Sequence, residues 1–396
     1  MKNKLSLLVC ACVLSAGLTG CMKDGENNGV IVTSQDESLA GIVVTAGDQA
    51  TPYYKLFVVN EGQMGTNNAS VDFLRFKDGK YVLNSYSQMN SGAALGDVAN
   101  DCKIYLNSVW VPITNSGILE VFSAVNETRI ASITIPSPRR VAFYGNYAYV
   151  TSYAGAVYGG ENRLGAIYRV DLNNGNTAGN IEVGYQPEGI AAGENGHLYV
   201  ANSGGYTAGY DNRLSIISTN TFSVEKDVEV APNLKDVFYD YDNDIVWVTS
   251  MGNYGDVHSG VYAVNALNGS LLASDEGLAA VRYTCAAFPY DGYLYVIGND
   301  NEYDWTGEPA YNLYKINSST RSVEKKVSFS SSELGDNHIA PYAICVNPLN
   351  GTIYISDAGD YKTPGKIVCY DKDLNFQWET NTGINPGHMS LYALVF

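Results

Sequence analysis

One short strand pattern recurs seven times along this 396-residue chain. In each copy aromatic and β-branched residues alternate, and Asn, Ser, Asp or Gly follows. The copies are 55–60, 108–112, 147–151, 197–202, 245–249, 293–297 and 352–356. Their central aromatic residues, from Phe57 to Tyr354, lie 53, 39, 50, 48, 48 and 59 residues apart. A period of roughly 40–50 residues is typical of β-propeller blades, so the sequence predicts seven blades.

Further strand patterns flank each copy. A second apolar strand follows it, and turn sequences such as 173–176 and 268–270 supply the positive φ angles that tight hairpins need. A third flanking strand completes the unit, as in 224–230 and 322–329. A short strand of small residues precedes most copies, at 140–143, 189–192, 283–287 and 342–346. The expected fold is therefore all-β, with seven four-stranded blades that we letter A to D from the axis outward.

The two ends of the repeat region complement each other. The first copy lacks a preceding strand A, whereas the last residues, 389–396, have the missing pattern. We therefore expect the C-terminal strand to close the first blade, which hides sheet edges that would otherwise be exposed. The propeller is expected to occupy residues 51–396.

The first residues have the pattern of an export signal. Lys2 and Lys4 precede an apolar run too short to span a bilayer, and Leu18–Cys21 resembles the bacterial lipobox. We predict a signal peptide over 1–20, lipidation of Cys21 and a polar tether over 21–50. An ordinary signal peptide with a chance cysteine is the alternative. The short acidic segment after the cysteine resembles surface-export signals of Bacteroidetes, which favours an outer-membrane protein facing outward.

Composition narrows the possible partners and chemistry. The chain has 24 Lys and Arg against 41 Asp and Glu, a net charge of -17, which disfavours nucleic acid. Four histidines are scattered, and no HExxH, GxSxG or phosphate-binding loop is present. Beyond Cys21 remain Cys102, Cys285, Cys345 and Cys369, without a CxxC pair. The first three lie in apolar strand-like runs, so we expect buried free thiols, with a disulfide or a metal site as the alternative. We predict no enzyme activity, catalytic residue, metal site or cofactor.

Two acidic motifs receive structural interpretations. The segment 240–244 is superficially similar to a calcium loop but has Ile245 where that loop needs Gly, so we expect a turn between strands A and B. The sequences Glu161-Asn162-Arg163 and Asp211-Asn212-Arg213 match at a spacing of 50 residues. We expect their acid and arginine to tie neighbouring loops together, with ligand contact as the alternative.

One face of the predicted propeller carries most of the candidate binding residues. Loops B–C and D–A emerge on that face, and they are rich in Gly, Tyr and amides. For any single tyrosine, packing between blades is the alternative, but the recurrence suggests a broad, shallow ligand site. The predicted ligand-binding residues are Tyr86, Tyr153, Tyr158, Tyr185, Tyr206, Tyr210, Tyr254, Arg282, Tyr303, Trp305, Tyr342 and Tyr361.

Residues 51–396, with LYVANSGG, YVTSYAG and ENRLGAIYRVDL, resemble the YncE-like seven-bladed propellers. Together with the lipobox and the Tyr-rich face, the chain is similar to the BtuG-type cobalamin-capturing surface lipoproteins of gut Bacteroidetes. That resemblance implies capture of vitamin B12 and its transfer to a TonB-dependent outer-membrane transporter. Two other classes stay open: a glycan-binding or protein-interaction propeller, and a propeller lyase or hydrolase, which would need a metal or an acid-base cluster at the axis.

Overall fold

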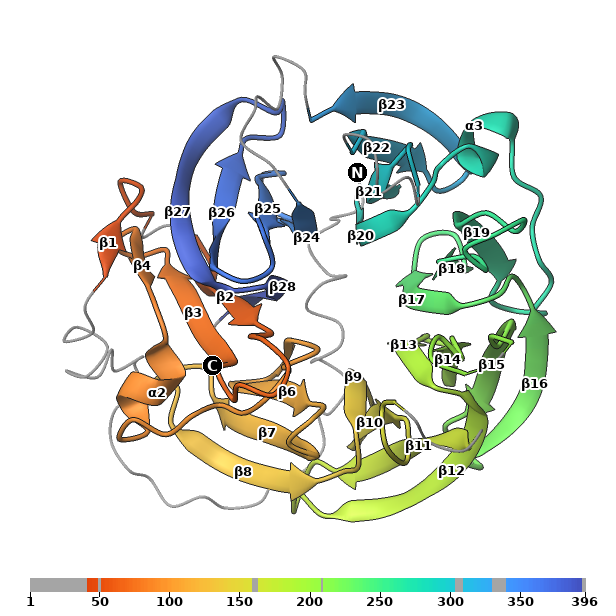
Figure 1. The fold of residues 1–396 in the computed structure, drawn as a ribbon, viewed down its shortest axis with the longest axis horizontal. Helices are drawn as coiled ribbons and strands as arrows, with labels where there is room; N and C mark the ends of the chain where they lie inside the picture. The colour runs from red at the N-terminus through yellow and green to blue at the C-terminus, as the bar shows by residue number, and fades with distance from the viewer. Residues whose placement is uncertain are drawn as a thin grey trace.

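Seven antiparallel sheets surround a central axis in the computed structural model, which describes residues 41–48, 51–158, 163–207, 209–302, 309–329 and 340–393 (Figure 1). Consecutive blades follow one another around the ring in chain order. The predicted seven-bladed β-propeller is confirmed.

The strands of each blade are ordered from the axis outward. Blade one contains β28 (Pro386–Ala393), β2 (Tyr53–Asn60), β3 (Ser70–Arg75), β4 (Lys80–Val82) and β1 (Ile42–Val43). Blade two contains β5 (Lys103–Tyr105), β6 (Ser108–Ile113), β7 (Ile118–Ser123) and β8 (Arg129–Thr134). Blade three contains β9 (Pro138–Tyr144), β10 (Tyr147–Ser152), β11 (Leu164–Asp171) and β12 (Thr177–Tyr185). Blade four contains β13 (Pro187–Ala192), β14 (His197–Asn202), β15 (Arg213–Ser218) and β16 (Ser223–Glu229).

The remaining blades follow the same order. Blade five contains β17 (Leu234–Asp240), β18 (Ile245–Ser250) and β19 (Gly260–Asn265). Blade six contains β20 (Thr284–Tyr290), β21 (Tyr293–Asn299), β22 (Tyr311–Asn317) and β23 (Ser322–Ser328). Blade seven contains β24 (Pro341–Val346), β25 (Ile353–Asp357), β26 (Pro364–Tyr370) and β27 (Phe376–Ile384). Two short helices, α2 (Ser85–Met89) and α3 (Glu276–Ala279), lie in connections.

Side chains of the recurrent strand B fill the spaces between blades. Tyr199 on β14 is fully buried and stacks on Tyr239 of the next blade, with ring centroids 5.8 Å apart. Trp247 on β18 is fully buried against residues of blades five and six. Because alternate residues of a strand point to opposite faces of its sheet, an apolar strand B packs on both neighbouring blades. The seven-fold apolar pattern is thus the interblade core.

The ring closes as the C-terminal pattern predicts. Strand β28 pairs with β2 in blade one, so strand A of that blade comes from the end of the chain. The carboxylate of Asp72 on β3 accepts a hydrogen bond of 3.0 Å from the backbone N–H of Gly383 on β27, which joins blades one and seven. On the other side of blade one, the ammonium group of Lys55 contacts Glu127 of blade two at 2.6 Å. Both ends of the repeat region are therefore tied to neighbouring blades.

Two blades differ from the expected four strands. Ile42–Val43, within the segment predicted to be tether, pairs with β4 and gives blade one a fifth, outermost strand. In blade five the described residues form three strands, and only a single bridge, Val264 to Leu271, stands where strand D was expected. Residues 1–40, which hold the predicted signal peptide and Cys21, lie outside the described residues. No helix within the described ranges is long and apolar enough to cross a membrane.

Two smaller predictions agree with the structure. Cys102, Cys345 and Cys369 are buried free thiols, and Cys285 is a free thiol that is partly buried. Asp240–Asp244 connects β17 to β18, and the Asp240 carboxylate accepts hydrogen bonds from the backbone N–H groups of Asp242 and Asn243 at 3.0 and 3.2 Å. This aspartate-rich segment is therefore a hydrogen-bonded turn between strands A and B.

Candidate functional site

A partly open cavity of about 640 Å³ lies on the propeller axis. The start of strand A in every blade contributes to its lining, as do several B–C loops. These segments belong to the face on which the sequence placed the candidate binding loops. The cavity is therefore the candidate binding site.

A repeated backbone turn brings polar residues to the axis. The residue that precedes each inner strand region has a positive φ of 39–63° in six blades, namely Val98, Ser137, Gln186, Asn233, Tyr283 and Asn385. The residues two and three positions later all line the cavity: Asn100 and Asp101, Arg139 and Arg140, Glu188 and Gly189, Lys235 and Asp236, Cys285 and Ala286, Gly387 and His388. The left-handed conformation reverses the chain direction as it enters the sheet. One local motif thus builds the floor of the site.

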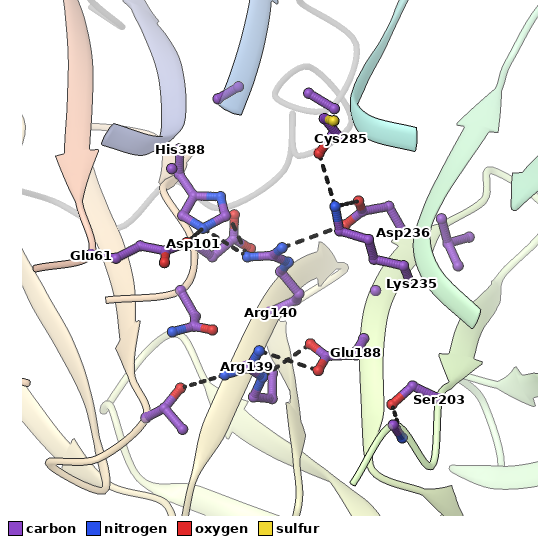
Figure 2. A pocket seen from close by; sticks show the side chains of 18 of the residues that line it. Glu61, Asp101, Arg139, Arg140, Glu188, Ser203, Lys235, Asp236, Cys285 and His388 are labelled. Carbon is purple, nitrogen blue, oxygen red and sulfur yellow. Dashed lines mark hydrogen bonds and ion pairs between the residues drawn. The ribbon is translucent and has the colours of Figure 1, made fainter. Parts of the chain in front are cut away.

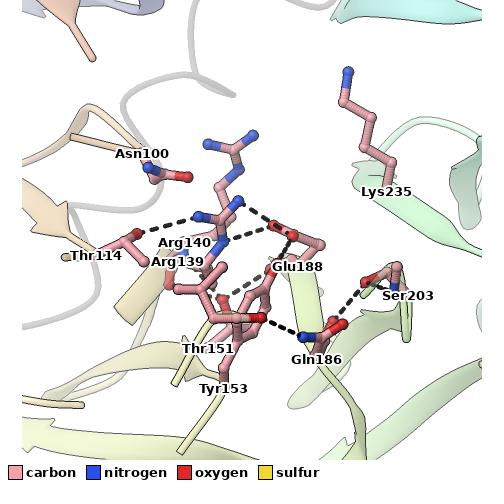
Figure 3. A network of polar contacts seen from close by, with 12 residues as sticks. Asn100, Thr114, Arg139, Arg140, Thr151, Tyr153, Gln186, Glu188, Ser203 and Lys235 are labelled. Atoms are coloured by element: carbon pink, nitrogen blue, oxygen red, sulfur yellow. Dashed lines mark hydrogen bonds and ion pairs between the residues drawn. The ribbon is translucent and has the colours of Figure 1, made fainter. Parts of the chain in front are cut away.

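Arg139 and Glu188 form a closed ion pair on this floor (Figure 3). Two guanidinium N–H groups of Arg139 donate to the two carboxylate oxygens of Glu188, at 3.0 and 3.2 Å. The hydroxyl of Thr114 accepts from Arg139 at 3.2 Å, and the hydroxyl of Tyr153 donates to Glu188. Arg139 also lies over the Tyr153 ring, 5.0 Å from its centroid. Paired hydrogen bonds of this kind hold both charged groups in fixed positions.

His388 lies between Arg140 and Glu61 (Figure 2). Its Nε2 atom is 2.9 Å from Nη1 of Arg140 and 3.3 Å from Oε1 of Glu61. The other oxygen of Glu61 accepts a hydrogen bond of 2.8 Å from Tyr342. Burial, reinforced by the charge of Arg140, lowers the pKa of His388. Burial alone would raise the pKa of Glu61, but hydrogen bonds from His388 and Tyr342 outweigh it and lower that pKa.

Lys235 and Asp236 complete the charged part of the floor. The ammonium group of Lys235 donates to the carbonyl of Cys285 at 2.8 Å and lies 3.8 Å from the Asp236 carboxylate. Burial would raise the pKa of Asp236, but the nearby charges of Lys235 and Arg140 lower it, so the group is a carboxylate. Four cations, Lys103, Arg139, Arg140 and Lys235, line the cavity with four carboxylates, Glu61, Asp101, Glu188 and Asp236. With His388 neutral, the charges of this lining balance.

Tyrosine pairs stand at the rim of the cavity. Tyr158 and Tyr206, from the B–C loops of blades three and four, have ring centroids 4.6 Å apart. The rings of Tyr254 in blade five and Tyr210 have centroids 6.2 Å apart. Tyr158, Tyr206 and Tyr254 line the cavity, and each is about half exposed. On the opposite side, Tyr342 lines the cavity and meets Tyr361 edge to face at 5.7 Å.

These three tyrosine pairs contain six of the predicted ligand-binding residues, of which four line the cavity while Tyr210 and Tyr361 lie behind them, outside the lining. The other predicted residues occupy different positions. Tyr86 is fully buried in α2 and donates a 2.7 Å hydrogen bond to Glu120, so it is a packing residue between blades one and two. Tyr153 is also buried, beneath Arg139 and Glu188. Tyr185 and Arg282 lie outside the cavity lining, and Tyr303 and Trp305 fall outside the described residues.

The paired Asp and Arg motif has the expected structural role in its second copy. Arg213 contacts both carboxylate oxygens of Asp211, at 2.8 and 2.6 Å. Asp211 also accepts a hydrogen bond of 2.8 Å from the backbone N–H of Tyr185 on blade three. The motif therefore ties the loop of blade four to the neighbouring blade. Glu161 of the first copy lies outside the described residues.

Most of the charged residues at the axis were not predicted from the sequence. Glu61, Asp101, Glu188, Lys235, Asp236 and His388 all line the cavity but were not predicted ligand contacts. Small residues of the inner strands, such as Ala286 and Ala343, line the cavity, but the larger polar side chains of Arg140, Asp236 and His388 line it as well. A signal was present, because polar dipeptides such as Arg139-Arg140 and Lys235-Asp236 begin otherwise apolar inner strands. Among the described residues, no group of three or more His, Cys, Asp or Glu side chains could hold a metal ion.

Comparisons with known proteins concern the fold. No protein-family model and no curated protein sequence matches this chain. The structure of a hypothetical selenium-binding protein from Sulfolobus tokodaii matches with a TM-score of 0.64 and 12% identity, over 87% of this chain and 95% of that chain. A quinonprotein alcohol dehydrogenase-like protein from Bacteroides thetaiotaomicron matches with a TM-score of 0.59 and 13% identity, over 87% and 79%.

A further solved structure extends the same likeness. Hydrazine synthase from Kuenenia stuttgartiensis matches with a TM-score of 0.59 and 14% identity, over 73% of this chain and 88% of that chain. At such identities the likeness concerns the arrangement of strands, because one propeller fold carries many unrelated functions. The chain is accordingly a seven-bladed β-propeller that shares its fold with these proteins.

Proposed function

We propose that this protein captures cobalamin in the axial cavity, as a lipoprotein on the outer-membrane surface, and passes it to a TonB-dependent transporter. In this proposal cobalamin is a bound cargo, and the protein needs no catalytic step of its own. The observation that carries the proposal is a rim of half-exposed tyrosines around a charge-balanced polar cavity.

The rim suits a broad and largely apolar ring system. Tyr158, Tyr206 and Tyr254 line the cavity with exposed fractions of 52, 54 and 49%. Large aromatic surface left open beside a cavity favours a ligand that covers it. The edge-to-face contact of Tyr158 with Tyr206 positions both rings before a ligand arrives, so less conformational entropy is lost on binding. A corrin macrocycle presents such a surface.

The floor suits a ligand without strong net charge. Each axial cation lies near a carboxylate, as in the closed pair of Arg139 and Glu188. Covering a balanced set of charges with a neutral ligand leaves no charge buried without a counter-charge, which would be costly. Cobalamin carries several primary amides around its ring, and these can donate and accept hydrogen bonds at such a floor. Its macrocycle would rest on the rim while side chains enter the cavity.

The lipobox-like Leu18–Cys21 supports attachment through lipid, since the mature chain's excess of acidic residues offers no attraction to anionic headgroups. A lipid-anchored capture protein needs a membrane partner to move its cargo inward, which is the part proposed for a TonB-dependent transporter. The resemblance to cobalamin-capturing lipoproteins supports this partner.

Calorimetric titration of the chain without residues 1–21 tests the proposal. We expect one cyanocobalamin bound per chain. Binding should be about tenfold or more weaker in Tyr206→Ala and Tyr254→Ala, because each removes an aromatic contact worth about 1.4 kcal/mol or more. Tyr241→Ala is the matched control: Tyr241 is 52% exposed but lies in the turn at the opposite end of β17. If cyanocobalamin did not bind, and titration with one of a panel of oligosaccharides released binding heat, glycan capture would replace this proposal.

A further inference from the structure

Two arginine–carboxylate pairs on the cavity floor differ in completeness. Arg139 and Glu188 share two hydrogen bonds of 3.0 and 3.2 Å, whereas Arg140 approaches Asp236 only to 3.5 Å. We infer that Arg140 and Asp236 form a subsite for an uncharged group that both donates and accepts hydrogen bonds, namely a primary carboxamide of the bound ligand. The inference rests on the proposed function and names the chemical group that the axis selects.

Asp236 has hydrogen-bonding capacity left over. Its two carboxylate oxygens lie 3.5 Å from Arg140 and 3.8 Å from Lys235, and the second distance is beyond hydrogen-bond range. The side chain is 18% exposed and lines the cavity. An ionised carboxylate offers about four acceptor positions, and the described protein groups leave most of them unused. A donor that enters the cavity would therefore find a strong acceptor.

Arg140 likewise has donors to spare. Its guanidinium has five N–H groups. In the described contacts one of them donates to His388 at 2.9 Å, and another makes a long contact of 3.5 Å with Asp236. The side chain is 17% exposed, and Figure 2 shows the guanidinium between His388 and Asp236 at the centre of the floor. An acceptor that reaches this point would find a fixed cation beside the carboxylate.

Small residues stand at the equivalent positions of three other inner strands. They are Gly189, Ala286 and Ala343, all in the cavity lining, while the remaining two strands carry Asp101 and His388 there. Gly189 belongs to the blade between those of Arg140 and Asp236, and a Cβ there would come within 2.7 Å of the backbone N of Val237, so the inner strands of blades four and five pack closely at this point. Gly189 has no side chain that could cover Arg140 or Asp236, and both of these residues line the cavity.

A carboxamide fits this arrangement because its donor NH₂ group and its acceptor oxygen are bonded to the same carbon. Its NH₂ group would donate to Asp236, and its carbonyl oxygen would accept from Arg140. A carboxylate in the same place would lack the donor and face Asp236 as a like charge, which disfavours binding. A site whose buried polar groups are left unpaired by an analogue discriminates strongly against that analogue.

Cobalamin monocarboxylates, in which one of the b, d or e propionamides is hydrolysed to an acid, test the subsite. We expect wild type to bind at least one of the three about tenfold more weakly than cyanocobalamin. Asp236→Asn should recover most of that loss, because the amide of Asn can donate to the ligand acid. Asp242→Asn, an exposed aspartate in the turn at the far end of β17, should keep the wild-type order of affinities.

The outcomes separate the subsite from the proposed function. The subsite would be overturned, while the capture function stands, if wild type bound cyanocobalamin and all three acids with affinities within twofold of one another. It would also be overturned if an Asp236→Asn protein as thermally stable as wild type kept the wild-type order of affinities. No binding of any corrinoid would reject the capture function and the subsite with it. Arg140→Gln gives a second check, because replacing the charged guanidinium with a shorter, neutral amide should weaken the binding of cyanocobalamin itself.

Discussion

Nη1 of Arg140 lies 2.9 Å from Nε2 of His388, although 248 residues separate them in the chain. Arg140 comes from the third blade, and His388 comes from the strand that closes the first. Arginine can only donate, so Nε2 of His388 accepts in this contact while it carries no proton. Glu61, 3.3 Å from the same nitrogen, would instead favour a proton there. Acid therefore opposes the contact between Arg140 and His388.

Folding stability should fall as pH drops below about 6.5. The pKa values of His388 and Glu61 are both lowered in the folded state, so the unfolded chain binds more protons. The contribution of His388 is present above its unfolded pKa and is lost as pH falls toward its folded value, and that of Glu61 follows at lower pH. Urea unfolding at pH 7.5, 6.5 and 5.5 measures the trend. His388→Gln should flatten it between pH 6.5 and 5.5, and an identical profile in this variant would contradict the assignment.

The buried ion pair between Lys55 and Glu127 should be a stability determinant of ring closure. Both side chains have no exposed surface, and they join blades one and two at 2.6 Å. Lys55→Met would leave Glu127 charged and buried, which typically costs about 3–5 kcal/mol. Lys77→Met, at an exposed position, should change the free energy of unfolding by less than about 0.5 kcal/mol.

Denaturant titration compares those two variants with Lys55→Met/Glu127→Gln. The double variant should regain part of the lost unfolding free energy, since it no longer has a buried carboxylate without a counter-charge. A Lys55→Met protein as stable as wild type would show that this pair does not hold the two blades together.

The four thiols of the propeller should be nearly inert in the folded protein. Burial raises the pKa of Cys285 to about 11 and those of Cys345 and Cys369 to about 12, and it raises the pKa of Cys102 as well. Thiolates are the reactive species, so a thiol reagent at pH 8 should react slowly before denaturation and with four groups after it. The chain without residues 1–21 removes the other cysteines. Fewer than four thiols in the denatured, unreduced protein would indicate a disulfide.

Lipid attachment is expected at one position. Cys21→Ser should abolish incorporation of labelled fatty acid, because the thiol of Cys21 is the predicted acceptor of the lipid. Cys12→Ser, within the apolar run, is the matched control and should be acylated like wild type. Acylation of the Cys21→Ser protein would contradict lipid attachment at Cys21.

The fold could be predicted because its cause repeats. An apolar strand B is buried on both sides in each blade, so seven similar sequences were visible without any long-range information. The closing strand could be inferred since strand A of blade one was missing near residue 50 and present at the end. The extra pairing of Ile42–Val43 could not be predicted, because the apolar run 42–44 is too short to show the alternation of a half-buried strand.

The lining of the candidate site was only half predictable. Loop tyrosines such as Tyr206 and Tyr254 line the cavity on the expected face, because their residue type and loop position are local properties. Tyr86 was misplaced, since a partly polar loop sequence gave no sign that a short helix would bury the ring against Phe122. Contacts across the axis, such as Arg140 with Asp236, depend on how blades meet, which no spacing in the sequence records.

Hydrogen–deuterium exchange with and without cyanocobalamin would locate the bound ligand on the propeller. Cobalamin capture at the axis predicts slower exchange in the B–C loops that hold Tyr158, Tyr206 and Tyr254, together with the inner-strand start at Asp236. Amides in the opposite turn at 241–244 should be unchanged. Unchanged exchange throughout, or protection confined to the turns of the opposite face, would contradict cobalamin capture at the axial cavity.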